Sequence, residues 1–239
     1  GCTDIVRGEK VRPHSWPFMA ALQFKNSVVF CGGALVQKQW VLTAAHCSFN
    51  ESEDRVVLGA HQPSIAEKEQ QIFKVIRSFP NPWYDERTKE NDIMLLKLND
   101  TAKLNKYVQL LPLPDSFEDI QPGTLCNVAG WGRTSTGKQP KCLQKTTLKI
   151  VGREKCNRKY GHNQTITKNM LCAAGKNPLF PSDTCRGDSG GPLICDGQYS
   201  GIVSFGKECG KRGIPGVYTR LTESYFNWIK KTISCHRNP

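Results

Sequence analysis

The sequence predicts an all-β fold that ends in one α-helix. Short segments rich in Val, Ile, Leu and Phe recur along the chain, each bounded by Gly, Pro, Asn or Asp, which is typical of strands joined by turns. Near the end of the chain, apolar residues recur at helical spacing instead. The chain has 239 residues and shows no fixed-period repeat or low-complexity linker. This length suits a single compact all-β unit.

The expected strands are distributed over the whole chain. They cover residues 18–24, 28–31, 56–58, 93–98, 125–130, 148–151 and 201–205. The segment 224–233 is predicted to be an amphipathic helix, with Lys230 and Lys231 between its apolar residues. Those apolar residues are Tyr225, Trp228, Ile229 and Ile233. We interpret this stripe as packing against the body of the protein and not as a binding surface.

Cysteine usage indicates the compartment. Eleven cysteines favour an oxidising environment, and no CxxC pair is present that would indicate a zinc site. Three glycosylation sequons, at Asn50, Asn99 and Asn163, also fit passage through the secretory pathway. No apolar run has the length needed to span a bilayer. We therefore expect a secreted or granule protein without a metal or other cofactor.

The net charge of +12 implies attraction to polyanions such as sulfated glycans, anionic membranes or nucleic acid. The alternative is that the lysines are solvated and serve only solubility. The sequence does not show whether the basic residues cluster. Among the polyanions we expect a sulfated glycosaminoglycan or proteoglycan as the partner, and no specific nucleic acid.

The stretch 184–193, TCRGDSGGPL, carries the strongest chemical signal. A serine hydroxyl becomes a nucleophile only with a neighbouring base, and its attack on a carbonyl creates an oxyanion that needs hydrogen-bond donors. Ser189 is the candidate nucleophile, and the backbone N–H groups of Gly187 and Ser189 are the candidate oxyanion hole. Glycine allows the tight turn that this requires. The alternative is a glycine-rich turn that contains an incidental serine.

The motif GDSGGP at 187–192 resembles that of the trypsin/chymotrypsin-like serine proteases. The family's TAAHC pattern also occurs, at 43–47, and the resemblance implies that His46 is the general base and later the general acid. Asp92 opens an apolar strand, where a carboxylate is costly unless it is hydrogen-bonded. By the same resemblance it holds the histidine tautomer. The order His–Asp–Ser along the chain is that of the chymotrypsin arrangement.

The resemblance also implies a more specific fold: two six-stranded antiparallel β-barrels followed by the C-terminal helix. The N-terminal barrel is expected at about 16–111 and the C-terminal barrel at about 124–223. The active site would lie in the cleft between them.

Asp183, six residues before Ser189, occupies the position that forms the floor of the specificity pocket in this family. A carboxylate there pairs with arginine or lysine. Gly206 and Gly216 match the pocket walls and leave room for a long side chain. Ser204, at the same edge, matches the serine that supports the buried aspartate. The resemblance therefore implies cleavage after Arg or Lys; the alternative for Asp183 is an ordinary acid in a loop.

The segment Ile5-Val6-Arg7-Gly8 resembles the start of the active family members, whose new α-amino group pairs with the acid that here is Asp188. Residues 1–4 precede Ile5, so we expect a proenzyme, with 1–4 as propeptide and 5–239 as protease domain. Asp4 is not the Arg or Lys that a trypsin-like activator needs, and four residues suit removal by a dipeptidyl peptidase. Arg7 replaces the usual glycine, which leaves the ease of insertion open.

From Ile5 to about Ile233 the chain is most similar to granzymes of the A and K kind. The family pattern implies disulfides Cys31–Cys47, Cys126–Cys195, Cys156–Cys172 and Cys185–Cys209. For Cys2, Cys142 and Cys235 a Cys142–Cys235 bond and an intermolecular bond both remain open. Trp83 stands where granzyme A has its intermolecular cysteine, so we expect a monomer.

The sequence thus predicts a granzyme A/K-like serine endopeptidase, with serine protease inhibitors and an activating dipeptidyl peptidase among its partners. One alternative is a trypsin-like protease of the complement or plasma type. Another is a catalytically silent, cationic heparin-binding or antimicrobial homologue. Such homologues usually lose the His or the Ser of the triad, and neither is lost here.

Overall fold

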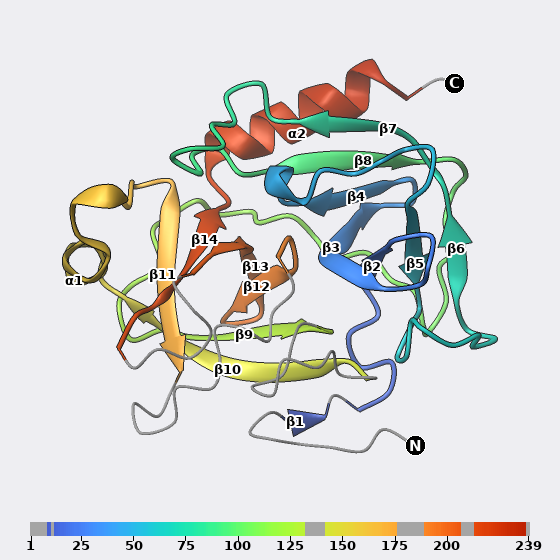
Figure 1. Cartoon of the computed structure of the whole chain (residues 1–239), viewed down its shortest axis with the longest axis horizontal. Helices are drawn as coiled ribbons and strands as arrows, with labels where there is room; N and C mark the ends of the chain where they lie inside the picture. The colour runs from blue at the N-terminus through green and yellow to red at the C-terminus, as the bar shows by residue number, and fades with distance from the viewer. Residues whose placement is uncertain (1–8, 11, 132–141, 176–188, 207–212, 238–239) are drawn as a thin grey trace.

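The structure, a computed structural model, describes residues 9–10, 12–131, 142–175, 189–206 and 213–237. It consists of two antiparallel sheets, each made from one half of the chain apart from one short strand, followed by a C-terminal helix (Figure 1). The all-β fold with one terminal helix is therefore confirmed.

The N-terminal sheet curls into a barrel. Its strands are β2 (Met19–Gln23), β3 (Val29–Gln37), β4 (Trp40–Thr43), β5 (Arg55–Leu58), β6 (Gln71–Phe73), β7 (Val75–Pro80) and β8 (Met94–Leu98). Their order in the sheet is β6-β5-β2-β3-β4-β8-β7. β6 and β7 are separated only by Lys74, yet they lie at opposite ends of this order, so the sheet must bend round to bring its ends together. Counted as one interrupted strand, β6 and β7 complete a six-stranded barrel.

The C-terminal sheet closes directly. Its strands are β9 (Leu125–Gly130), β10 (Gln144–Val151), β11 (Met170–Gly175), β12 (Pro192–Cys195), β13 (Gln198–Phe205) and β14 (Gly216–Arg220). β9 pairs with both β12 and β10, which joins the two ends of the six-stranded ring. The short strand β1 (Glu9–Lys10) adds to β10 from outside. This seventh strand had no signal in the sequence.

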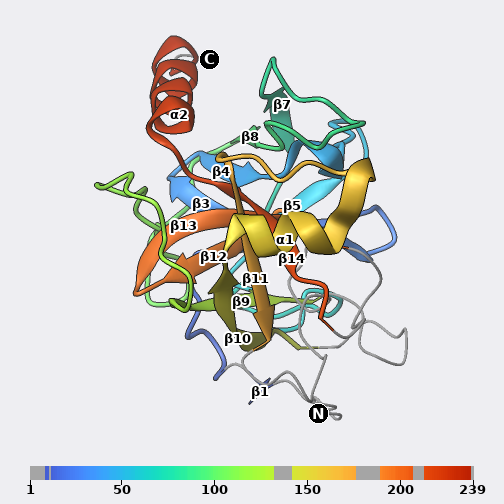
Figure 2. The ribbon, with the colours of Figure 1, turned by 90° about the vertical axis from the view of Figure 1, so that its left-hand side faces the viewer.

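All seven predicted strands coincide with parts of observed strands, but several elements were missed. The largest is α1 (Arg153–Tyr160), whose sequence REKCNRKY has no apolar stripe that could predict a helix. Cys156 and Tyr160 are its buried residues. Figure 2 shows α1 in front of the strands of the C-terminal barrel, and it contacts β11. Packing at two positions therefore holds a helix that periodicity does not reveal.

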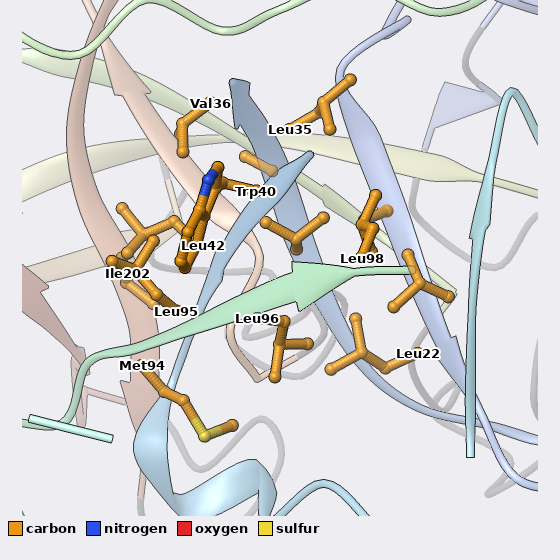
Figure 3. Packing of buried hydrophobic residues seen from close by; sticks show 14 of the residues in the cluster. Leu22, Leu35, Val36, Trp40, Leu42, Met94, Leu95, Leu96, Leu98 and Ile202 are labelled. Carbon is orange, nitrogen blue, oxygen red and sulfur yellow. The ribbon is translucent and has the colours of Figure 1, made fainter. Parts of the chain in front are cut away.

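The C-terminal helix α2 (Glu223–Cys235) is slightly longer than predicted at both ends. Thr222 caps it, because its side chain accepts a hydrogen bond from the Tyr225 backbone N–H at 3.3 Å. The buried face of α2 belongs to the main apolar cluster of the N-terminal barrel. Figure 3 shows part of this cluster, in which Ile202 of β13 lies among residues of β3, β4 and β8. The C-terminal helix is thus packed against the N-terminal barrel. None of the described helices is long and apolar enough to cross a membrane.

Candidate active site

His46 lies on a short 3₁₀ turn, η1 (Ala45–Cys47), directly after the buried strand β4. The Cys31–Cys47 disulfide ties the end of this turn to β3. The His46 backbone N–H donates to Asp92 Oδ1 at 2.9 Å, and the His46 Nδ1 lies 2.6 Å from Asp92 Oδ2. The side chain of His46 is 22% exposed, and that of Asp92 is fully buried. The imidazole is therefore fixed on one edge and open to solvent on the other.

Asp92 precedes β8 and receives donors from both barrels. Besides His46, the Ser204 hydroxyl donates to Asp92 Oδ2 at 2.6 Å, as the sequence predicted for a supporting serine. The Thr219 hydroxyl donates to the backbone carbonyl of Asp92 at 2.9 Å. Ser204 and Thr219 are both buried. These contacts offset the cost of burying a carboxylate and join the two barrels at one residue.

The segment at Ser189 packs directly against the strand that carries Cys31. The Ser189 carbonyl oxygen accepts a hydrogen bond from the Gly32 backbone N–H at 2.9 Å. Gly190 follows with φ +88°, and a Cβ at this position would overlap Thr43 Oγ1 and the Gly32 carbonyl. Only glycine satisfies both the backbone angle and the close approach. The close approach of the N-terminal barrel therefore restricts position 190 to glycine.

The two glycines predicted as pocket walls lie next to each other. Gly206 is exposed, at the end of β13, and Gly216 is buried at the start of β14. A Cβ added to Gly206 would lie 3.9 Å from Gly216 Cα. Side chains at these two positions would take up volume that the bare glycines leave open. Asp183, the predicted pocket floor, lies outside the described residues.

Other predicted site residues also fall outside the described ranges. They are Gly187 of the oxyanion hole, the activation residues Asp4, Ile5 and Asp188, and the Cys185–Cys209 disulfide. They remain predictions from the sequence. The three sequon asparagines, Asn50, Asn99 and Asn163, are described, and all three are exposed. In the described part of the chain no group of His, Cys, Asp and Glu side chains is arranged to hold a metal ion.

Two tyrosines near Asp92 were missed as site residues. Tyr225 was predicted as part of the helix stripe, but its hydroxyl also donates to Asn91 Oδ1 at 2.7 Å. Burial, followed by the charges of Glu90 and Asp92, raises the pKa of Tyr225 to about 12. Burial and then the Asp92 charge raise the pKa of Tyr84 to about 12 as well. Both phenols therefore stay neutral beside the aspartate at physiological pH.

Three of the four predicted disulfides are formed: Cys31–Cys47, Cys126–Cys195 and Cys156–Cys172. The possible Cys142–Cys235 bond is wrong. Cys142 is disulfide-bonded, whereas Cys235 is free and exposed. The partner of Cys142 is therefore a cysteine outside the described residues. Cys235 stands in the last turn of α2, and the helix directs it to solvent.

Comparison with known proteins agrees with this geometry. The family model described as Trypsin matches residues 5–229. Granzyme A of Bos taurus is 40% identical over 98% of this chain and 89% of its own length. Mast cell protease 3 of Ovis aries is 42% identical over 98% of this chain and 91% of its own. The structure of neuropsin, a serine protease of mouse brain, superposes with a TM-score of 0.84 at 39% identity, covering 96% of this chain and all of that chain. The chain belongs to the trypsin family of serine proteases.

Proposed function

We propose that this chain is a granzyme A/K-like serine endopeptidase that cleaves after Arg or Lys and is held as a proenzyme until residues 1–4 are removed. The observation that carries the proposal is the contact between His46 and the buried Asp92, supported by Ser204. A histidine oriented by a buried carboxylate, with a serine as its partner, is the arrangement that activates a hydroxyl for acyl transfer.

In the proposed reaction, Ser189 attacks the scissile carbonyl and His46 takes its proton. The resulting imidazolium is stabilised by Asp92, which stays ionised. The backbone N–H groups of Gly187 and Ser189 stabilise the oxyanion. His46 then gives the proton to the leaving amine, and an acyl-enzyme forms on Ser189. A water molecule, deprotonated by His46, hydrolyses this ester and restores the serine.

Specificity for Arg or Lys is proposed from Asp183 at the pocket floor and from the absence of side chains at Gly206 and Gly216. A Gly206 Cβ would lie 3.9 Å from Gly216 Cα, which supports adjoining wall positions that carry no side chains. A long basic side chain could pass alongside these glycines to a carboxylate. Cleavage by a dipeptidyl peptidase after Asp4 would free the amine of Ile5 to pair with Asp188. The domain then runs from residue 5 to 239.

The relatives named granzyme A and mast cell protease support a secreted or granule location. The net charge of +12 supports a sulfated glycosaminoglycan as a partner. Helix α1 alone carries four basic residues and one acidic residue. We propose a monomer that acts on protein substrates and is controlled by serine protease inhibitors. Elution from heparin at a salt concentration well above that for a neutral protein would be expected.

The decisive experiment measures hydrolysis of an arginyl thioester before and after dipeptidyl-peptidase treatment, with the new N-terminus sequenced. We expect activity only after Ile5 is exposed, and only on substrates with Arg or Lys before the scissile bond. Ser189→Ala, treated in the same way, is the matched inactive control. Asp183→Ser should lose the preference for basic residues while keeping the triad.

Two results would contradict the proposal. Equal activity before and after treatment would exclude the proenzyme state. A treated chain with exposed Ile5 that cleaves nothing would exclude the protease function and favour a cationic binding protein.

A further inference from the structure

A cavity of about 220 Å³ lies between the segment that joins the barrels and the turn from β12 to β13. It is lined by residues from within 114–120, 195–200 and 220–221, and we call it the linker cavity. The eight residues of β13 run from this turn to Phe205, next to Gly206. At about 3.3 Å per residue, the strand separates the cavity from the predicted substrate pocket by roughly 20 Å. The linker cavity is therefore distinct from the candidate active site.

The linker cavity is acidic, although the chain as a whole has a net charge of +12. Four acidic residues line it. They are Asp115, Glu118, Asp119 and Asp196. Asp119 is already paired with Arg153 at 2.6 Å. The other three are exposed, and they form no ion pair with any residue in the described ranges.

Arg220, the one basic residue in the described lining, is held by other contacts. Its Nε donates to the Lys168 carbonyl at 2.9 Å, and its Nη1 donates to the Phe117 carbonyl at 3.0 Å. The same Nε lies 3.9 Å from Asp119 Oδ1. The charge of Arg220 is therefore placed beside Asp119, which Arg153 also pairs. The three exposed carboxylates keep an excess of negative charge, so the cavity favours a cation.

Tyr199 adds an unsatisfied polar group to the lining. Its side chain belongs to the main apolar cluster and is 1% exposed. Its hydroxyl is buried and has no hydrogen-bond partner in the described part of the chain. Burial raises the pKa of this phenol, so it keeps its proton and its oxygen stays a neutral acceptor. Because an unpaired buried hydroxyl is costly, a ligand in the cavity that supplies a partner is favoured.

The walls of the linker cavity are formed before any ligand binds. Asp196 and Gly197 make the two-residue turn between β12 and β13 with φ values of +49° and +75°, the left-handed angles of a tight hairpin turn. The disulfide from Cys195 to Cys126 ties this turn to β9. On the opposite wall, the two-point contact of Asp119 with Arg153 holds the joining segment. A ligand therefore pays little to order its site.

We propose that the linker cavity binds one alkylguanidinium or alkylammonium group. The exposed carboxylates attract the cation, and one of its N–H groups donates to the Tyr199 hydroxyl oxygen. A volume of about 220 Å³ equals that of roughly seven water molecules, which suits one extended basic group and is smaller than typical pockets for drug-sized ligands. The group can belong to a Lys or Arg side chain of a polypeptide or to a free amine. This inference does not depend on the proposed protease function.

The test measures binding by titration calorimetry to the full chain carrying Ser189→Ala and Asp183→Ser. These changes prevent cleavage and remove the carboxylate of the proposed substrate pocket, so a basic ligand is not held there. The ligands are agmatine and the blocked peptide acetyl-Gly-Arg-Gly amide. We expect saturable binding with a Kd of about 1 mM or lower. The same peptide with neutral citrulline in place of arginine should not bind. Binding of agmatine alone would assign the site to a free amine, and binding of both ligands to a basic side chain.

Tyr199→Phe, in the same background, tests the buried hydroxyl. It should raise the Kd of agmatine about tenfold, because it removes a hydrogen bond to a charged group. The melting temperature without ligand should not fall, since the hydroxyl has no partner to lose. Tyr84→Phe is the matched control, because the Tyr84 hydroxyl is also buried without a partner but Tyr84 is not among the lining residues. Its Kd for agmatine should stay unchanged.

Asp196→Asn tests the acidic rim. It should raise the Kd of agmatine about threefold, a modest effect because the carboxylate is exposed and solvent screens it. Asp100→Asn removes an exposed acid outside the cavity and should leave the Kd unchanged.

Absence of saturable binding for both basic ligands would overturn the proposal, and so would an unchanged Kd in both Tyr199→Phe and Asp196→Asn. Neither result bears on the protease function, which is tested with Ser189 and Asp183 intact.

Discussion

In the N-terminal barrel, His46 and Asp92 stand at the margin of one large apolar cluster that also takes in helix α2 and part of β13. In the C-terminal barrel, the buried apolar residues form smaller clusters, and two of these each contain a disulfide, Cys126–Cys195 and Cys156–Cys172. The N-terminal barrel thus holds its candidate residues by one large cluster that contains the Cys31–Cys47 disulfide. The C-terminal barrel combines smaller clusters with two further disulfides and with hydrogen bonds to its neighbour.

The two barrels therefore position their candidate catalytic residues in different ways. The His46 imidazole must point one way, and it is held by a buried carboxylate that lies just before β8, a strand whose residues are all buried. The Ser189 segment is held instead by backbone bonds to Gly32 and Val203, which come from both barrels. His46 and Asp92 are therefore held mainly by the N-terminal barrel, with Ser204 and Thr219 of the other barrel bonded to Asp92. The Ser189 segment depends on backbone bonds to both barrels.

The largest effect should follow from removing the charge at Asp92. Asp92→Asn keeps the shape of the side chain but no longer stabilises the imidazolium or selects the tautomer of His46, so kcat should fall by about 10⁴-fold. The measurement is hydrolysis of an arginyl thioester by the activated enzyme. Asp115→Asn, at an exposed acid in the segment between the barrels, controls for loss of charge alone and should leave kcat unchanged. A fall of less than tenfold for Asp92→Asn would refute this role.

Shortening a buried leucine in each barrel should show how differently the two apolar clusters are packed. Leu95 in the N-terminal cluster and Leu148 in the C-terminal cluster are both completely buried. Each change to Ala should lower the free energy of unfolding by about 2–5 kcal/mol, because the cavity collapses only in part. We expect Leu95→Ala to cost more, since its cluster is enclosed by strands from both sheets and by α2. Denaturant unfolding in a Ser189→Ala background, which prevents self-cleavage, measures both. Equal losses would argue against a difference between the barrels.

Removing a disulfide should lower the free energy of unfolding more in the C-terminal barrel than in the N-terminal barrel, the reverse of the ranking expected for core truncations. Cys126–Cys195 spans 69 residues and Cys31–Cys47 spans 16. The chain-entropy model gives about 4 kcal/mol for the longer loop and about 3 kcal/mol for the shorter one. Paired Cys→Ala variants, unfolded thermally in the Ser189→Ala background, test this ranking. A greater loss for Cys31–Cys47 would mean that strain at the η1 turn outweighs loop entropy.

Sequence reasoning found the parts of the site that short motifs encode and missed those that depend on tertiary contacts. His46, Asp92 and Ser204 come together as predicted, because each sits at the end of a strand with a recognisable local pattern. Thr219 and the second role of Tyr225 had no such signal, since the residues they contact are more than 120 positions away. Helix α1 was missed for a related reason. Its two buried residues are Cys156, held by a disulfide, and Tyr160, which bonds to the Pro215 carbonyl; no periodic apolar pattern marks them.

The smallest effect concerns the segment that joins the barrels. Asp119 in this segment makes a two-point contact with Arg153 at the start of α1, at 2.6 and 2.8 Å. The Arg153 hydrogen bonds, partly opposed by burial, hold the pKa of Asp119 below its usual range. A lowered pKa in the folded state means that the unfolded chain binds protons first as the pH falls. The pair therefore stabilises the fold above the ordinary Asp pKa of about 3.9 and stops doing so as the pH falls through the lowered value.

Asp119→Asn should accordingly reduce stability at neutral pH by less than about 1 kcal/mol, because the Asp119 side chain is 44% exposed and solvent screens the pair. The deficit should shrink as the pH falls below about 4, where Asp119 of the unfolded wild-type chain becomes protonated, and should disappear below the lowered pKa of the folded state. Thermal unfolding of Ser189→Ala with and without Asp119→Asn, followed from neutral to acidic pH, measures this convergence. Asp115→Asn is the matched control on the same segment. A deficit that stays constant down to about pH 2 would show that Asn fails for a reason other than charge. Asp119 would then stabilise the fold through the shape of its side chain, as the core residues of the N-terminal barrel do. The charge of its pair with Arg153 would not matter.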